Sequence, residues 1–97
     1  MPDRLSSTEI EEKLRSLTGW ALNPTVPQIE RTYVRKNFLD AVQFIREIAP
    51  LAEERDHHPD ILLSGYKNVK VMLSTHSAGG ITQNDFDLAA AIDNIPA

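Results

Sequence analysis

Apolar residues recur along this chain with helical spacing in some segments and strand-like alternation in others. The first helical segment is marked by the pair Thr8 and Glu11, which fits a capping box, and Gly19 is expected to end this helix. Its apolar positions are Ile10, Leu14 and Leu17. Residues 20–22 are predicted to form a short strand, and residues 28–35 alternate as a second strand with one mixed face.

A long second helix is predicted to follow Asn37, whose side chain suits the N-cap position. Pro50 removes a helical hydrogen bond, but the apolar pattern continues past it, so we predict one helix, kinked at Pro50 and reaching about Glu54. The apolar stripe is wide enough to serve both a core and a subunit contact. Its members are Phe38, Ala41, Val42, Phe44, Ile45, Ile48, Ala49, Leu51 and Ala52.

The C-terminal half predicts a hairpin and a last helix. Residues 61–64 and 69–75 alternate as strands on either side of a turn at 65–68, and Gly79-Gly80 then breaks the chain. Thr82 and Asp85 have the spacing of a helix N-terminus. The predicted order is α-β-β-α-β-β-α, an α+β fold in which helices pack on one face of a small antiparallel four-stranded sheet.

Composition and charge narrow the functional classes. A chain of 97 residues predicts a single domain spanning 1–97, and so small a domain is expected to form a homo-oligomer. The net charge of −4 argues against direct nucleic-acid binding. The sequence has no cysteine, no apolar leader and no stretch long enough to cross a membrane, so we expect a cytoplasmic protein.

All three histidines fall between residues 57 and 76. If the two strands of the hairpin pair, the start of one lies beside the end of the other, which brings His57, His58 and His76 to the same end of the sheet. Pro59 favours an extended backbone at His58. Histidine titrates near neutral pH, so such a group is suited to acid–base chemistry or to polar ligand recognition.

Two other interpretations of the histidines remain open at this point. Histidines in small domains are often surface or capping residues. A metal site would combine the three histidines with Asp56 or Asp60, although adjacent histidines chelate less well than a pair one helical turn apart.

The spacing of a larger motif resembles the signature of the pterin-4a-carbinolamine dehydratases. The motif consists of Glu53, His57-His58-Pro59, Tyr66, His76 and Asp85. Further similarities extend over nearly the whole chain: Gly19-Trp20, Ile29 with Arg31, Phe38, Phe44, Thr75-His76 and Gly79-Gly80.

The resemblance implies an enzyme that dehydrates 4a-hydroxytetrahydropterin to quinonoid dihydropterin during tetrahydrobiopterin recycling, without a metal or a bound cofactor. It implies that His57 and His76 are the acid–base groups and that His58 orients the 4a-hydroxyl group. It also implies that Asp56 and residues Ser74, Thr75, His76 and Ser77 border the pterin. Dimers or tetramers are expected for this family.

Several motif residues have two competing interpretations. Glu53 either orients a histidine or lies on a solvated helix face, and Asp85 either holds His76 in one tautomer or caps the last helix, which we favour. Tyr66 is expected to pack in the hairpin rather than bind a ligand. Trp20 is expected in the core or a pocket wall, and Arg31 in a salt bridge.

The sequence also departs from the family pattern and leaves a second functional class open. Ile61 stands where many relatives carry an aromatic residue, and residues 61–65 lack the usual polar asparagine pattern, which weakens the expected stacking on the substrate. The alternative is a protein-binding or dimerisation module that uses the second helix. On that interpretation, a charge at Phe44 or Ile48 would disrupt binding.

Overall fold

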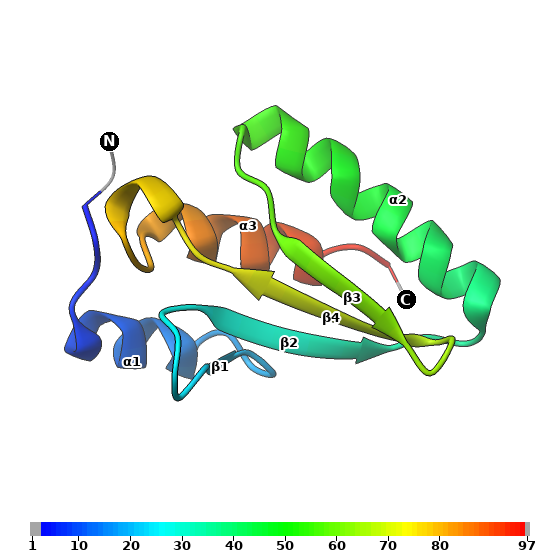
Figure 1. The fold of residues 1–97 in the computed structure, drawn as a ribbon, viewed down its shortest axis with the longest axis horizontal. Coiled ribbons are helices and arrows are strands. Elements are labelled where there is room, and N and C mark those ends of the chain that lie inside the picture. The colour runs from blue at the N-terminus through cyan, green and yellow to red at the C-terminus, as the bar shows by residue number, and fades with distance from the viewer. Residues whose placement is uncertain (1–2, 97) are drawn as a thin grey trace.

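The computed structural model describes residues 3–96, and its elements follow the predicted α-β-β-α-β-β-α order (Figure 1). One additional 3-10 helix, η1, precedes the last helix. The elements are α1 (Ser7–Arg15), β1 (Ala21–Leu22), β2 (Ile29–Val34), α2 (Phe38–Arg55), β3 (Asp60–Ser64), β4 (Asn68–Leu73), η1 (His76–Ala78) and α3 (Gln83–Asp93).

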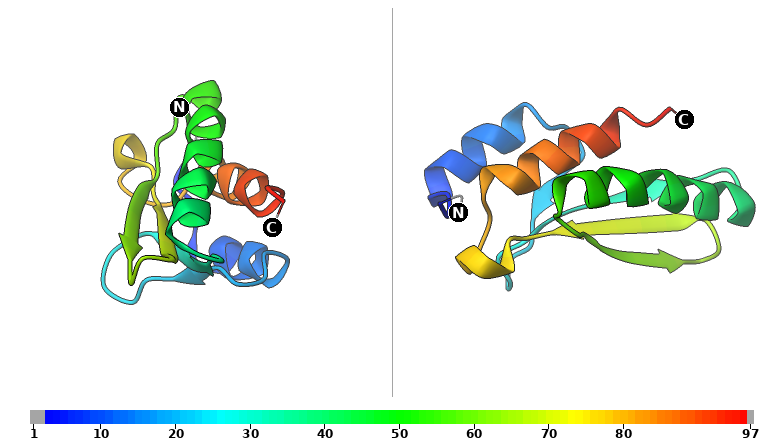
Figure 2. Two further views of the ribbon diagram at one scale, coloured as in Figure 1. Left: turned by 90° about the vertical axis from the view of Figure 1, so that its right-hand side faces the viewer. Right: turned by 90° about the horizontal axis from the view of Figure 1, so that it is seen from above.

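The four strands form one antiparallel sheet in the order β1-β2-β4-β3. Val69, Val71 and Leu73 alternate as buried positions along the central strand β4, as period-2 patterning requires. They face the three α-helices, which lie together on one face of the sheet (Figure 2). The predicted α+β fold is therefore confirmed.

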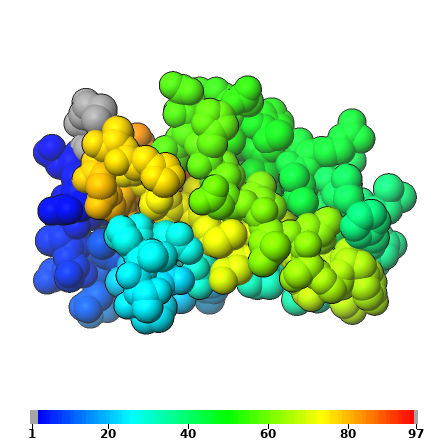
Figure 3. All heavy atoms as spheres, viewed as in Figure 1, coloured from blue at the N-terminus to red at the C-terminus, as the bar shows by residue number. Residues whose placement is uncertain are grey.

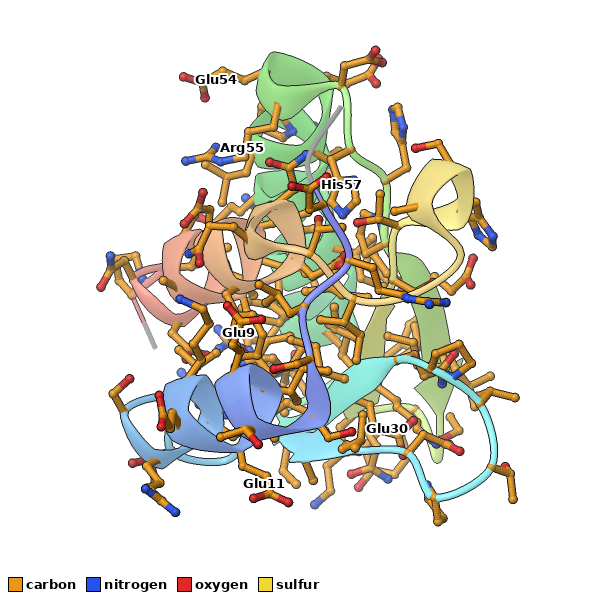
Figure 4. The ribbon with its side chains drawn as sticks, turned by 90° about the vertical axis from the view of Figure 1, so that its left-hand side faces the viewer. Glu9, Glu11, Glu30, Glu54, Arg55 and His57 are labelled. Carbon is orange, nitrogen blue, oxygen red and sulfur yellow. The ribbon has the colours of Figure 1, made fainter. Side chains whose placement is uncertain are left out.

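The N-terminal cap of α1 differs from the prediction. Ser6, not Thr8, is the N-cap, and its hydroxyl accepts from the Glu9 backbone N–H at 3.2 Å while Glu9 accepts from the Ser6 N–H at 2.9 Å. Glu11 is exposed and points away from the protein (Figure 4). The helix consequently begins earlier along the chain than the sequence pattern suggested.

The predicted end of this helix at Gly19 is also wrong. The helix ends at Arg15 and is capped by Ser16, whereas Gly19 lies in the following turn with φ +95°. A Cβ atom at Gly19 would lie 2.8 Å from the guanidinium carbon of Arg31. Glycine is needed here for a positive φ and for close approach of the Arg31 side chain.

Helix α2 continues across Pro50, as predicted, and ends at Arg55. Asn37 caps it by accepting from the Asp40 N–H at 2.8 Å. The predicted docking positions are wrong, because Phe44 and Ile48 are 1% and 0% exposed and belong to the core. A charge at either position would unfold the domain rather than test a surface.

The large exposed apolar side chains of α2 lie instead in its first turn. Phe38 is 56% exposed and Leu39 is 79% exposed. Phe38 belongs to the predicted apolar stripe but lies outside the core. The kink at Pro50 stays a prediction.

The β3–β4 hairpin turns through two consecutive residues with positive φ, Gly65 at 53° and Tyr66 at 56°. Tyr66 is 60% exposed and lies 5.6 Å from the Lys67 ammonium group, so it does not pack inside the hairpin as expected. Strand β4 ends at Leu73, before the predicted Thr75, which instead bridges to Gly80.

Across residues 3–96, no helix is both long enough and apolar enough to span a membrane. The cytoplasmic location stays a prediction.

Candidate functional site

The hairpin register gathers the histidines at one end of the sheet, as predicted. Asp60 at the start of β3 pairs with Met72 near the end of β4. The segment that carries His57 and His58 therefore enters the sheet beside the place where β4 leaves it toward His76. In Figure 1 the linker from α2 to β3 descends on the same side of the protein as η1.

A left-handed residue at the end of α2 aims His57 inward. Asp56 has φ 48° and ψ 44°, a conformation that aspartate tolerates better than most non-glycine residues. The His57 backbone N–H then returns to the Ala52 carbonyl at 3.1 Å. Figure 4 shows His57 beneath the helix end, whereas Glu54 and Arg55 point outward. The observed contribution of Asp56 is thus to the backbone turn before His57.

His57 is anchored by a buried carboxylate. Its Nε2 lies 2.6 Å from Asp85 Oδ1, and the two side chains are 11% and 0% exposed. A carboxylate has only acceptor sites, so the proton in this contact belongs to His57 Nε2. In the neutral ring, Nδ1 then carries the lone pair available to another group.

Asp85 also caps α3, which confirms the favoured interpretation. Its Oδ2 accepts from the Thr82 backbone N–H at 2.9 Å and from the Thr75 hydroxyl at 2.8 Å. The histidine that it holds is His57 rather than His76. The spacing that predicts the cap could not reveal the contact with His57, because His57 comes from a distant segment of the sequence and binds the other carboxylate oxygen, Oδ1.

His58 also contacts a carboxylate, but both side chains are exposed to solvent. Its Nε2 lies 2.5 Å from Glu53 Oε2, with the side chains 59% and 74% exposed. The contact matches the interpretation in which Glu53 orients a histidine. Exposed ion pairs contribute only about 0–1 kcal/mol, so Glu53 constrains His58 much less than Asp85 constrains His57.

His76 begins η1 and borders a hollow of about 260 Å³. The opposite wall comes from the loop between β1 and β2, and Figure 3 shows the cyan atoms of this loop beside the yellow atoms around η1. The lining residues are Val26, Pro27, Gln28, Ser74, Thr75, His76, Gly79 and Gly80. Ser74, Thr75 and His76 are thus brought together, whereas Ser77 is exposed outside this lining set.

The β1–β2 loop also lines the hollow beside His76, which the sequence did not indicate. Gln28 Nε2 donates to Glu30 Oε2 at 2.9 Å, and Asn23 Nδ2 donates to the same oxygen at 3.2 Å. Hydrogen bonds from Gln28 first and Asn23 next lower the pKa of Glu30. The local signal was the turn at Asn23-Pro24, but nothing local indicates that this loop reaches His76.

A second hollow, of about 280 Å³, lies beside His58. Pro59 and Ile61 line it together with Glu53 and apolar residues of α2. Ile61 therefore contributes an aliphatic wall to this hollow. Within residues 3–96, no three potential metal-ligating side chains are grouped around a common point.

Trp20 and Arg31 have structural roles, as expected. Trp20 is 5% exposed and belongs to the core. Arg31 forms a salt bridge with Asp93 at 3.0 Å.

The structure is thus a small α+β domain with three helices on one face of its sheet and with histidines at one end of that sheet. The family profile described as "Pterin 4 alpha carbinolamine dehydratase" matches residues 3–95. The chain belongs to the pterin-4a-carbinolamine dehydratase family.

Full-length relatives support this assignment. A Roseiflexus protein, provisionally named a pterin-4-alpha-carbinolamine dehydratase, is 46% identical and covers 98% of this chain and 99% of its own. A similarly named protein of Nostoc punctiforme is 43% identical, again over 98% of this chain and 99% of its own.

Two solved structures share the fold. A transcriptional coactivator/pterin dehydratase from Brucella melitensis is 36% identical, with a TM-score of 0.88 over 94% of this chain and 96% of that one. A pterin dehydratase-like RuBisCO assembly factor of the alpha-carboxysome is 22% identical, with a TM-score of 0.63 over 77% of this chain and 86% of that one. The second likeness supports the fold alone.

Proposed function

We propose that this protein is a hydro-lyase that dehydrates a 4a-hydroxytetrahydropterin to the quinonoid dihydropterin and so supports tetrahydrobiopterin recycling. The observation that carries the proposal is the pairing of His57 with buried Asp85 in a chain that matches the dehydratase family from residue 3 to residue 95. In this reaction the C4a–O bond breaks, the hydroxyl group leaves as water, and a ring N–H gives up its proton.

The histidines suit the two proton transfers that this reaction needs. One group must protonate the departing hydroxyl and another must accept the ring proton, and positioned acid–base groups contribute about 10²–10⁴-fold. We assign these two transfers to His57 and His76. His57 would work through Nδ1, because Asp85 occupies Nε2. His58 would orient the 4a-hydroxyl group.

The pterin would lie between the two histidine-bearing segments. Ser74 and His76 line the hollow beside η1, which favours this location for part of the substrate. Asp56 and Ser77 would border the pterin from the two flanking segments. The reaction as proposed needs no metal and no bound cofactor.

The first experiment follows the decay of a 4a-hydroxytetrahydropterin by its ultraviolet absorbance, with and without the protein. We expect decay to accelerate in proportion to protein concentration, above the spontaneous rate in buffer. Heat-denatured protein at the same concentration is the control. Decay at the buffer rate in the presence of folded protein would contradict the dehydratase proposal.

A second candidate function is protein binding through α2, with a second copy of this chain as the occupant. The observation that favours it is the exposed apolar first turn, where Leu39 is 79% exposed beside Phe38 at 56%. Two large exposed apolar side chains in one helical turn favour an interaction surface here. The coactivator name of the Brucella relative supports an interaction role on this fold.

Replacing Leu39 by glutamate is expected to weaken self-association at least tenfold and to leave dehydration per subunit unchanged. A carboxylate in the first turn of a helix is tolerated by the fold, because it lies near the positive end of the helix dipole. Gln43→Glu, which adds the same charge at another exposed position of α2, is the matched control. Sedimentation equilibrium measures the effect, and an unchanged dissociation constant in L39E would exclude this surface.

A further inference from the structure

Two buried threonine hydroxyl groups form a series of hydrogen bonds, here called the hydroxyl chain, that ends at Asp85. Thr75 Oγ1 is 2.8 Å from Asp85 Oδ2 and 2.8 Å from Thr82 Oγ1. Thr75, Thr82 and Asp85 are 5%, 0% and 0% exposed, so water does not compete for these contacts. These hydrogen bonds link Thr75, which follows β4, to Thr82, the N-cap of α3, and they end on the Asp85 carboxylate that holds His57.

The direction of every hydrogen bond in this chain is determined by chemistry. The carboxylate can only accept, so Thr75 must donate its single hydroxyl proton to Asp85. Thr75 Oγ1 can then only accept from Thr82, whose hydroxyl in turn accepts from the Asn84 N–H at 3.2 Å. The donors all lead toward Asp85, and such chains strengthen one another in a buried setting.

The Thr75 main chain is occupied as well. Its N–H donates to the Gly80 carbonyl at 2.8 Å, and its carbonyl accepts from the Ala78 N–H at 3.1 Å. The side chain and the backbone of Thr75 are therefore both engaged within the protein. The hydroxyl group in particular has no remaining proton with which to contact a substrate.

We propose that Thr75 is a positioning residue that acts through Asp85 to keep the Nε2 proton on His57, leaving Nδ1 as the working nitrogen. Two donors on Oδ2, from Thr75 and the Thr82 backbone, fix the carboxylate and satisfy part of its negative charge. Asp85 therefore orients the His57 ring without removing its proton. The link between Thr75 and catalysis rests on the proposed dehydratase function. The assignment of the His57 tautomer does not depend on that function.

Nitrogen-15 NMR of the histidine rings tests the tautomer directly. At a pH where the histidine rings carry a single proton, we expect that proton of wild-type His57 on Nε2, and a Thr75 hydroxyl proton that exchanges slowly with water. In Thr75→Val, which keeps the shape but lacks the donor, the Nε2-protonated fraction should fall, and Thr75→Ser should restore it. Thr32→Val, the same change at an exposed position of β2, should leave the spectrum unchanged.

Kinetics give a second and separate test. Thr75→Val should lower kcat about 10- to 100-fold with little change in KM, a part of the roughly 10²–10⁴-fold that a positioned acid–base group supplies. A raised KM at unchanged kcat, with the His57 resonances unmoved, would show that Thr75 acts on the substrate and would overturn the proposal. So would a wild-type His57 whose single ring proton lies on Nδ1, a result that needs neither a folded variant nor any turnover.

Discussion

Replacing His76 by alanine is expected to slow dehydration by about 10²–10⁴-fold, while the free energy of unfolding changes by less than about 0.5 kcal/mol. The ring is exposed at the start of η1 and makes no hydrogen bond to any other side chain among residues 3–96. The loss of rate would therefore report chemistry and not folding. The measurement is the ultraviolet decay of the 4a-hydroxytetrahydropterin, with the buffer rate subtracted, alongside urea denaturation of the same samples.

The other two histidines provide the matched comparison. His57→Ala should lose as much activity as the His76 variant, but it should also lose about 1–3 kcal/mol of stability, because the buried Asp85 oxygen is left without its donor. His58→Ala should lose less of both, since the contact between His58 and Glu53 is exposed. A larger activity loss in His58→Ala than in His57→Ala would reverse the assigned roles. Full activity in His76→Ala would remove His76 from the mechanism.

Elements with a strong local signal could be predicted from the sequence. Asn37 and the pair Thr82 and Asp85 cap their helices as expected, because each cap is made by residues only two or three positions apart. The alternation in β4 gave the buried face, because a strand places every second side chain on one side.

The start of α1 shows where local signals compete. Ser6 with Glu9 and Thr8 with Glu11 both have capping-box spacing. Leu5 and Ile10 settle the choice, since both pack with the core and occupy the positions of a hydrophobic staple around Ser6. The Leu5 N–H also donates to the Ile81 carbonyl at 2.8 Å, a contact between distant segments that no local pattern reports.

The position of the candidate site could be predicted from the sequence, but the hydrogen-bond partners of its histidines could not. Hairpin pairing alone brings the histidines to one end of the sheet, because antiparallel register fixes which residues lie side by side. The partner of each histidine depends on how α2, α3 and η1 pack. The prediction that Phe44 and Ile48 lie on a docking surface was wrong for the same reason. The apolar pattern of a helix does not show which part of a wide stripe packs against the sheet.

Asp93 joins the end of α3 to β2 and to Trp20, which precedes β1, by accepting hydrogen bonds from three side chains. The Trp20 indole N–H lies 3.0 Å from Oδ2, the Arg31 guanidinium lies 3.0 Å from Oδ1, and the Tyr33 hydroxyl donates to Oδ1. Burial first, and the neighbouring carboxylate of Asp93 next, raise the pKa of Tyr33, so its hydroxyl stays a donor throughout the physiological range. Nothing in the spacing of these residues along the chain indicates this cluster.

Asp93→Ala is expected to destabilise the domain by about 2–4 kcal/mol, because it leaves the buried indole N–H and the half-buried Tyr33 hydroxyl without their acceptor. For a domain of this size, the melting temperature should fall by roughly 8–30 °C. Trp20 is the single tryptophan, so its fluorescence reports unfolding from within the cluster.

The magnitude separates this cluster from an ordinary surface ion pair. If only the pairing of Arg31 with Asp93 mattered, the loss would be about 0–1 kcal/mol, since Arg31 is 32% exposed. Asp93→Asn, which keeps one acceptor oxygen, should fall between wild type and Asp93→Ala. Asp87→Ala, an exposed aspartate on the same helix, should change stability by less than about 0.5 kcal/mol. Equal stabilities of the Asp93→Ala and Asp87→Ala variants would show that the Trp20 and Tyr33 donors find water instead, and that α3 is held to the sheet by apolar packing.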